Sequence, residues 1–218
     1  MFDIKVALKK TDKVLPYDYY YKMHGFICNL LGNNFYCSMQ NNYIYSNLMG
    51  GDYTKDGIVF KEQPYFFIRT DDDTVLANFL NSLSNNKTKL FEGFEIEGFM
   101  TLLPKIKTSY FRTVKSSPIL VSKTFDKKDN LSNDDLKETE KYLVESVIRH
   151  AKEYNVSIDE NLMIEIIRQH KHKDILYKET INKGRVFELK INANKETKEF
   201  IISHGIGRST GSGFGFLI

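Results

Sequence analysis

The sequence is poor in cysteine, in net charge and in long apolar runs, and each shortage excludes a class of protein. Cys28 and Cys37 are the only cysteines in 218 residues, which argues against a disulfide framework and indicates a reducing compartment. The formal net charge is only +3, so a nucleic-acid surface must come from local clustering of basic residues. No apolar run is long enough to cross a membrane, and the N-terminus lacks the pattern of a signal peptide. We therefore expect a cytoplasmic protein.

Several catalytic motifs are also missing. The chain has no Cys-x-x-Cys pair and no carboxylate set with the spacing of metal ligands, so we expect neither a metal site nor a cofactor. It has no Gly-Lys-Ser/Thr, which argues against a P-loop. Gly207-Arg-Ser-Thr-Gly211 has the Gly-x-Ser-x-Gly spacing, but it follows a predicted helix and precedes a predicted strand, the reverse of the strand-to-helix turn of a serine hydrolase, which we therefore do not expect. The three adjacent aspartates 71–73 are read as the cap of a helix, where they face the positive end of its dipole.

The first half predicts a β-α-β-β-α-β order. Residues 2–8 alternate apolar and polar, which is typical of a half-buried strand. A helix is expected over 19–31, capped by Asp18 and stopped by Gly32. Further strands are expected at 43–45, 57–61, 65–69 and 91–103, and a second helix reaches residue 83. This order is the ferredoxin-like pattern, a common RNA-binding scaffold.

The second half repeats the order. Its expected elements are a strand at 117–121, a helix at 134–153, a strand at 163–168, a hairpin of 175–180 with 186–191 turning at Asn182–Gly184, a helix at 194–203 and a final strand at 214–218. Ile148 is assigned to the inward face of the first of these helices. We therefore predict an α+β protein of two tandem ferredoxin-like domains, residues 1–115 and 116–218.

The C-terminal segment is the most informative part of the chain. Five glycines fall within the eleven residues Gly205 to Gly215, between a predicted helix and a predicted strand. Glycines let the backbone turn several N–H groups towards one point, which makes a nest for an anion. Arg208, Ser209, Thr210 and Ser212 add donors suited to phosphate. The loop therefore predicts a phosphate contact.

Two basic stretches extend the candidate surface. Lys105, Lys107, Arg112 and Lys115 are interleaved with Tyr110 and Phe111, a pattern that suits a polyanion with stacking bases, although lysines at an exposed strand edge give the same pattern. The densest basic run, at the end of a predicted strand, consists of Arg168, His170, Lys171, His172 and Lys173.

The glycine loop resembles that of one family, the CRISPR-associated endoribonucleases of the RAMP superfamily that cut repeat RNA into guide units. Gly205, Gly207, Gly213, Phe214 and Gly215 match glycine and phenylalanine positions of its C-terminal motif G-x-G-x-x-x-x-G-x-G-F-G, with one residue fewer between Gly207 and Gly211. The opening strand, the Leu15–Asp18 segment and the Ser117–Val121 strand match the layout along the whole chain. The resemblance implies RNA contacts at Gly205, Gly207, Arg208, Ser209, Thr210, Gly211, Gly213 and Gly215. It also implies recognition of the CRISPR repeat and one metal-independent cut, in which the ribose 2′-hydroxyl attacks the adjacent phosphate to leave a 2′,3′-cyclic phosphate and a 5′-hydroxyl.

The same resemblance indicates catalytic residues. Tyr21-Lys-Met-His24 is similar to the Tyr-x-Met/Leu-His of the branch that cuts hairpin repeats, which implies His24 as general base or acid and Tyr21 or Tyr20 as the residue that positions the 2′-hydroxyl. Other branches carry their histidine after this helix, where residues 35–46 of this chain have none. Cleavage without histidine and binding without cleavage therefore stay open, as do a protein-interaction module, a homodimer and assembly with other CRISPR subunits. His204 is expected to end the last helix.

Overall fold

The computed structural model describes residues 1–32, 42–85, 89–91, 93–103, 114–121, 128, 130–170, 172–177 and 180–218. The chain divides into two compact units, which are described separately. The first comprises Met1–Pro104 with Ile175–Thr180, and the second comprises Lys105–Asp174 with Ile181–Ile218. The division after Pro104 precedes the boundary expected at Lys115, and the segment 175–180 joins the first unit rather than the second.

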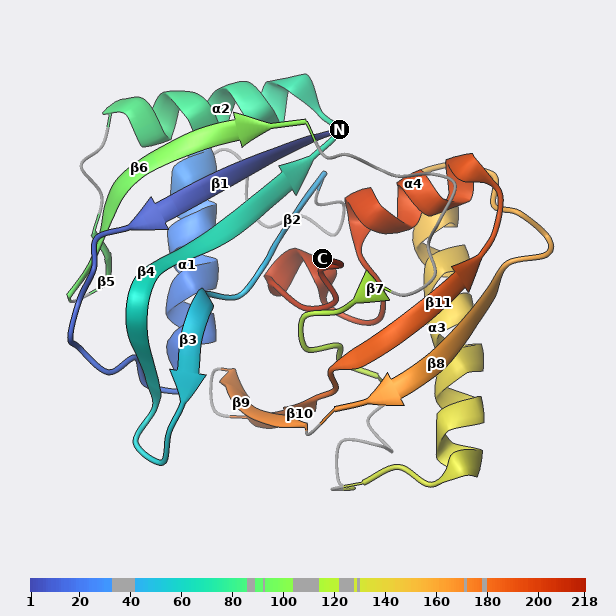
Figure 1. Cartoon of the computed structure of the whole chain (residues 1–218). Helices are drawn as coiled ribbons and strands as arrows, with labels where there is room; N and C mark the ends of the chain where they lie inside the picture. Colours follow the sequence, from blue (N-terminus) through green and yellow to red (C-terminus); the bar gives the residue numbers. More distant parts are fainter. Residues whose placement is uncertain are drawn as a thin grey trace. The chain divides into compact units, whose positions relative to one another are not determined.

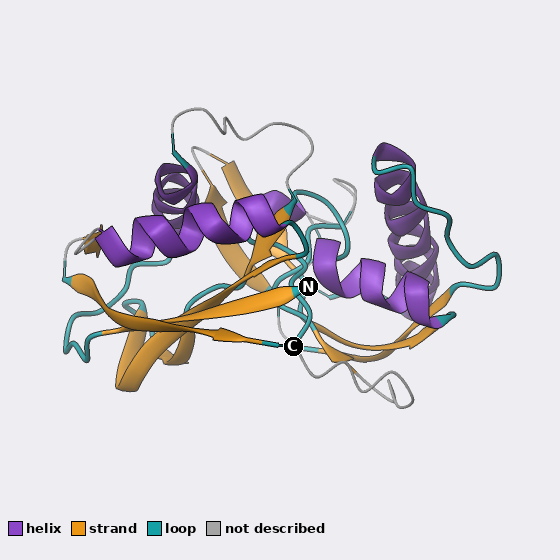
Figure 2. Ribbon diagram, turned by 90° about the horizontal axis from the view of Figure 1, so that it is seen from above, coloured by secondary structure: helices purple, strands orange, loops and turns teal. Residues whose placement is uncertain are grey.

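The first unit is an antiparallel sheet with two helices on one face (Figures 1 and 2). Its elements are β1 (Phe2–Leu8), α1 (Tyr19–Leu31), β2 (Tyr43–Tyr45), β3 (Met49–Tyr53), β4 (Ile58–Thr70), α2 (Asp73–Asn85), β5 (Lys89–Phe91) and β6 (Phe94–Leu102). The strand order is β2-β4-β1-β6-β5, with β3 also paired to β4. The first and last strands of the β-α-β-β-α-β pattern are therefore neighbours, and β4 lies beside β1, as the ferredoxin-like fold requires.

Alternation of apolar residues explains how this sheet meets its helices. Ile4, Val6 and Leu8 of β1 are fully buried on the helix side, and Met23 and Ile27 of α1 are buried as well. Gly32 ends α1 with a φ of +84°, which glycine adopts without strain. Asp72, in the predicted aspartate cap, accepts the backbone N–H groups of Thr74 and Val75 at the start of α2. The prediction of β1, β2, the bounds of α1 and the cap of α2 is confirmed, but Asp18 precedes α1 without a side-chain cap hydrogen bond.

Two strand predictions were wrong. Residues 57–61 and 65–69 belong to the single strand β4, which continues through Pro64. The register between β3 and β4 shifts between Met49 and Gly51, and such an irregularity lets a strand contain a proline that has no N–H to donate. The strand β3 was not expected at all. Position 51 in β3 requires glycine, because a Cβ there would collide with the side chains of Ile58 and Phe60.

The second unit repeats the arrangement with a smaller sheet. Its elements are β7 (Val114–Lys115), α3 (Asn133–Glu153), β8 (Met163–Gln169), β11 (Phe187–Asn192), α4 (Lys195–His204) and a 3₁₀ turn at Thr210–Ser212. The two-stranded pair β9 (Lys173–Tyr177) and β10 (Thr180–Gly184) has residues in both units. The order β7-β11-β8 is covered by α3 and α4 on one face (Figure 2). The expected final strand is reduced to the isolated bridge Ser116↔Leu217, which is flanked by backbone hydrogen bonds from Ser117 to Phe216 at 2.7 Å and from Ile218 to Lys115 at 2.9 Å. This is again the ferredoxin-like strand order.

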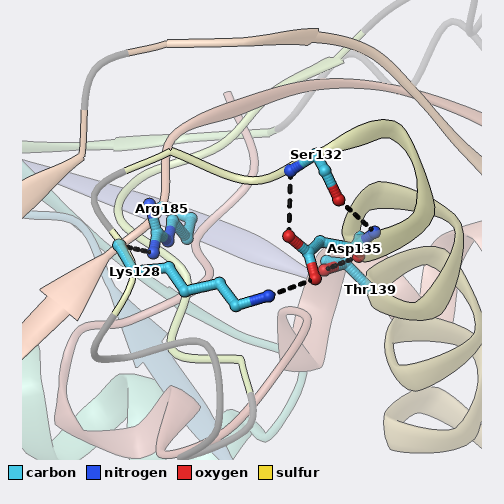
Figure 3. Close-up of polar contacts among 5 residues, drawn as sticks. All are labelled: Lys128, Ser132, Asp135, Thr139 and Arg185. Atoms are coloured by element: carbon cyan, nitrogen blue, oxygen red, sulfur yellow. Dashed lines mark hydrogen bonds and ion pairs between the residues drawn. The ribbon is translucent and has the colours of Figure 1, made fainter.

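Figure 3 shows why α3 begins where it does. The Ser132 N–H donates to Asp135 at 2.9 Å, and the Asp135 N–H donates back to the Ser132 hydroxyl at 3.2 Å, which is a capping box. Lys128 pairs with Asp135 at 2.6 Å, and this contact together with the Ser132 N–H lowers the pKa of Asp135 to about 2. Arg185, which is only 1% exposed, donates a hydrogen bond to the Lys128 carbonyl and so holds the segment before α3 in place.

The core of this unit lies between the sheet and the two helices. Its members come from the sheet, from both helices and from the glycine loop, and they include Leu143, Val147, Ile164, Phe187, Leu189, Ile201 and Ile206. Leu143 and Val147 were assigned to the inward face of α3 correctly. Ile148, assigned with them, is 38% exposed because it lies on the neighbouring side of the helix.

The predicted hairpin turn at Asn182–Gly184 was wrong. These residues belong to β10, which pairs with β9, and residues 187–192 form β11 beside β8. Arg185 explains the difference. Its N–H and carbonyl both bond to Ile119, at 2.8 and 2.6 Å, and this pairing holds the backbone extended where the local sequence favours a turn.

Candidate functional site

His24 lies on α1, half-buried, and has a contact at each ring nitrogen. Its Nδ1 is 3.2 Å from the Tyr45 hydroxyl, and its Nε2 is 3.6 Å from Sγ of Cys28, one helical turn further along. Cys28 is disulfide-bonded, which departs from the reducing environment that the cysteine content indicated. A disulfide sulfur has no hydrogen to donate, so Nε2 is the donor in that contact and Nδ1 of the neutral ring accepts the Tyr45 hydroxyl. The two contacts fix the tautomer and the orientation of the imidazole.

Tyr45 is the partner that the sequence analysis missed. Its ring is nearly parallel to the imidazole, at 26° with the centroids 6.5 Å apart, and it is 1% exposed. A buried tyrosine whose hydroxyl points at a histidine is an orienting group, because it cannot itself reach a ligand in solvent. The Tyr43-Ile-Tyr45 strand was recognised, but nothing in its alternation indicates which helix residue it meets.

The two tyrosines proposed beside His24 occupy different environments. Tyr20 is 5% exposed, and burial raises its pKa well above the ordinary value, with the neighbouring Tyr53 adding to the shift. A phenol held neutral in the core does not exchange protons with a substrate near neutral pH. Tyr21 is 50% exposed on α1, so of the two it is the one that a ligand can touch.

The glycine loop is largely internal, and its main-chain N–H groups have acceptors within the protein. The N–H of Gly207 donates to the Ser146 hydroxyl at 3.1 Å, and that of Gly215 donates to the Pro118 carbonyl at 2.9 Å. Gly205 and Gly213 donate to Ile201 and Thr210. The expected anion nest is therefore not formed by these four amides. Their glycines are needed for the backbone, since all four have positive φ values between +70° and +91°.

The outer part of the loop remains as a candidate contact surface. Ser209 is exposed in a left-handed conformation with φ +60°, and it precedes the 3₁₀ turn of Thr210–Ser212. Arg208, Thr210 and Gly211 are half-buried. The main-chain N–H of Arg208 bonds to the Leu120 carbonyl at 2.9 Å, which leaves the hydroxyls of Ser209 and Thr210 as the most accessible donors.

The structure brings together two lysines from the separate basic stretches. Burial, and to a smaller extent the positive charge of Lys115, lower the pKa of Lys173 to about 8. Both residues belong to the second unit. A partly desolvated ammonium group under the influence of a second positive charge favours an anion that offsets the repulsion. Lys105, Lys107, Arg112 and Lys171 lie outside the described residues.

The remaining basic residues are partly neutralised by carboxylates. His170 pairs with Glu188 at 2.8 Å, and the same glutamate lies opposite the exposed Arg168 in the β8–β11 register. His172 lies 3.5 Å from Asp174 and 3.3 Å from Lys183, which also approaches Asp174 at 3.4 Å. Lys183 was missed because the sequence analysis placed it in a turn.

The other two histidines have structural surroundings. His204 ends α4, as expected, and its ring stacks on Phe200 at 4.3 Å while Nδ1 lies 2.7 Å from the Ser203 hydroxyl. His150 lies near the end of α3, where burial lowers its pKa. Neither is among the residues expected to contact RNA.

One concavity of the second unit lies away from the predicted site residues. It has a volume of about 640 Å³ between α3 and β8, and none of the predicted site residues lines it. Within the described ranges, no group of three or more histidine, cysteine, aspartate or glutamate side chains is placed to hold a metal ion. No helix in this part of the chain combines the length and the apolar character needed to span a bilayer.

Comparison with known families decides the assignment. The model of the family described as "CRISPR associated protein Cas6, C-terminal" matches residues 100–218, more than half of the chain. The chain belongs to the Cas6 family. The matched region contains both basic stretches, and it contains the Ser117–Val121 segment and the whole glycine loop, on which the resemblance in the sequence rested.

Solved structures share the Cas6 fold over the full length. A Cas6-related gene product from Pyrococcus furiosus is 18% identical with a TM-score of 0.81, covering 100% of this chain and 97% of that one. A RAMP protein binding different RNA substrates is 18% identical with a TM-score of 0.80, covering 100% and 98%. A further CRISPR associated protein Cas6 is 18% identical with a TM-score of 0.77 and the same coverage. No curated protein matches the chain.

Proposed function

We propose that this Cas6 family member binds CRISPR repeat RNA and cleaves pre-crRNA into guide units, by attack of a ribose 2′-hydroxyl and without a metal ion. The observation that carries the proposal is the arrangement of His24. It is half-buried on α1, with Tyr45 and Cys28 fixing its ring. A histidine whose tautomer is fixed by a buried partner is the form in which imidazole serves as a general acid or base.

The reaction requires two proton transfers. The 2′-oxygen loses its proton and attacks the adjacent phosphorus, and the bond from phosphorus to the 5′-oxygen breaks. The 5′-oxygen takes up a proton, so the products are a 2′,3′-cyclic phosphate and a 5′-hydroxyl. His24 performs one of these transfers, and positioned general acid–base catalysis of this kind contributes about 10²–10⁴-fold to the rate. Tyr45 orients the imidazole, and Tyr21 is the exposed hydroxyl of the helix.

Phosphate contacts are assigned to the second unit. Lys115 and Lys173 form a lysine pair whose repulsion a phosphate relieves, and Arg208, Ser209 and Thr210 add donors at the outer part of the glycine loop. Arg168, His170 and His172 are further phosphate contacts, and Glu188 and Asp174 partly offset the positive charge around them. The RAMP protein of the same fold binds different RNA substrates, which supports RNA as the ligand.

The test uses the repeat of the host CRISPR array as a 5′-labelled RNA, incubated with the protein in EDTA. Cleavage at one position, with a product that carries a cyclic phosphate, supports the proposal. A substrate with a single 2′-deoxyribose before the cut should remain intact and still bind, since the nucleophile alone is removed. Cleavage that requires a divalent metal, or that proceeds on the deoxy substrate, contradicts it.

One observation favours a second function, a non-cleaving RNA-binding subunit of a CRISPR complex. Tyr20 is buried, so of the three predicted catalytic side chains only His24 and Tyr21 are accessible. Tight binding of the repeat without any cyclic phosphate product would establish this alternative. A homodimer and contacts with other CRISPR subunits stay predictions, which the mass of the RNA-bound particle tests.

A further inference from the structure

Two exposed tyrosines of the first unit stack on one another and form an aromatic surface. The rings of Tyr17, just before α1, and Tyr53, at the end of β3, are nearly parallel, at 15°, with their centroids 6.1 Å apart. Their side chains are 37% and 46% exposed, although both rings are large and apolar. Exposed aromatic rings that the core does not use are characteristic of surfaces that stack a ligand.

The Tyr17 ring is held in place before any ligand binds. Its hydroxyl donates to the carbonyl of Thr54 and lies 3.3 Å from that of Gly57. The loop that supplies these carbonyls is closed by the Thr54 N–H, which donates to Gly57 at 2.8 Å. Leu15 and Ile58 exchange backbone hydrogen bonds of 2.9 and 2.8 Å, which anchor Tyr17 to the start of β4. A ring fixed in this way loses little conformational freedom when a ligand stacks on it.

The start of α1 connects this surface to His24. Tyr17 lies just before α1, which begins at Tyr19 and carries His24, and Tyr45 of the same unit contacts the His24 imidazole at 3.2 Å. Tyr20 and His24 are one helical turn apart on the same side of α1. The rise from the start of α1 at Tyr19 to His24 is about 7.5 Å. The aromatic surface therefore lies within reach of a nucleotide next to one bound at His24.

We infer that Tyr17 and Tyr53 form a stacking subsite for a nucleobase of single-stranded RNA, beside the nucleotide whose phosphate is cut. The inference rests on the proposed function. Single-stranded RNA is recognised largely by stacking of unpaired bases on aromatic side chains, which needs an accessible ring face and little sequence-specific hydrogen bonding.

Substitution at Tyr53 tests the subsite. Tyr53→Leu keeps an apolar side chain and removes the ring face, and it should weaken binding of the repeat roughly 10-fold. Tyr53→Phe is the matched control, because it keeps the ring, and its affinity should stay within about twofold of the wild type. The ring is exposed at the end of a strand, so both variants should fold, which circular dichroism checks.

A fluorescent base locates the contact. Repeat RNAs that carry 2-aminopurine at one position at a time should show strong quenching on the wild type at a position next to the cut. Tyr53→Leu should relieve this quenching and Tyr53→Phe should not. If the wild type binds and cuts the repeat while Tyr53→Leu matches it in affinity and quenching, the subsite is refuted and the proposed function stands. If the wild type does not bind the repeat at all, both are refuted.

Discussion

Replacing Gly215 with alanine tests whether the glycine loop is built for its own folding or for a ligand. Gly215 has a φ of +70°, and a Cβ there would lie 1.9 Å from the Ile206 carbonyl oxygen and 2.9 Å from its carbonyl carbon. Neither partner can move easily. Ile206 is fully buried, its N–H donates to the Gly215 carbonyl at 3.1 Å, and the Gly215 N–H donates to Pro118.

The expected loss of stability has two parts. A residue with a side chain costs about 1–2 kcal/mol in the left-handed region. Forcing extra volume into a packed core costs about 1–3 kcal/mol more. We therefore expect Gly215→Ala to lower the free energy of unfolding by about 2–5 kcal/mol, and the melting temperature by roughly 5–15 °C for a chain of this size.

Thermal unfolding by circular dichroism measures this effect, and two other glycines provide matched controls. Gly98→Ala should be close to neutral and Gly25→Ala stabilising by about 0.5–1 kcal/mol, because each Cβ meets no atom within 4 Å and Gly25 lies inside α1. The reasoning is refuted if Gly215→Ala melts within about 1 °C of the wild type. Loss of RNA affinity at unchanged stability would mean instead that Gly215 contacts the ligand.

Two further predictions concern titration. Burial lowers the pKa of His150 below the value of about 6.5 that it has in the unfolded chain, so the unfolded state takes up its proton first and stability should fall as the pH drops through 6.5. Urea midpoints at pH 8 and pH 5.5 measure this loss of stability. The loss should be smaller in His150→Gln, and an equal loss in that variant would contradict the assignment to His150. A phosphate bound at Lys173 should raise its pKa from about 8, so RNA binding at pH 8 should take up a proton, at most about half of one. Calorimetry in two buffers of different ionisation enthalpy detects the uptake, and an equal uptake by Lys173→Met would assign it to another group.

Local periodicity predicted the elements whose sequence and packing agree. β1 alternates over seven residues, and α1 has both an apolar stripe and a glycine stop, so its bounds were predicted correctly. The sequence failed where a distant partner outweighs a local signal. Pro64 reads as a break but lies within β4, and Asn182–Gly184 reads as a turn but is held extended through the pairing of Arg185 with Ile119.

The candidate site was predictable in part for the same reason. His24 was identified from a local string on one helix, but its orienting partner Tyr45 lies on a different element and depends on tertiary packing. The glycine pattern indicated correctly that the backbone turns with positive φ. It did not indicate where the N–H groups point, because Ser146 and Pro118, which accept two of them, are distant in sequence. Glycine content alone therefore does not separate a ligand-binding loop from a packed one.

The central claim is that the His24 imidazole transfers a proton in RNA cleavage. Single-turnover cleavage of the cognate repeat in EDTA, with saturating protein, tests it most directly when wild type and His24→Ala are compared and RNA affinity is measured for both. We expect His24→Ala to cut at least about 10²-fold more slowly and to bind with nearly the same affinity. A variant that cuts at the wild-type rate would place the chemistry on other residues.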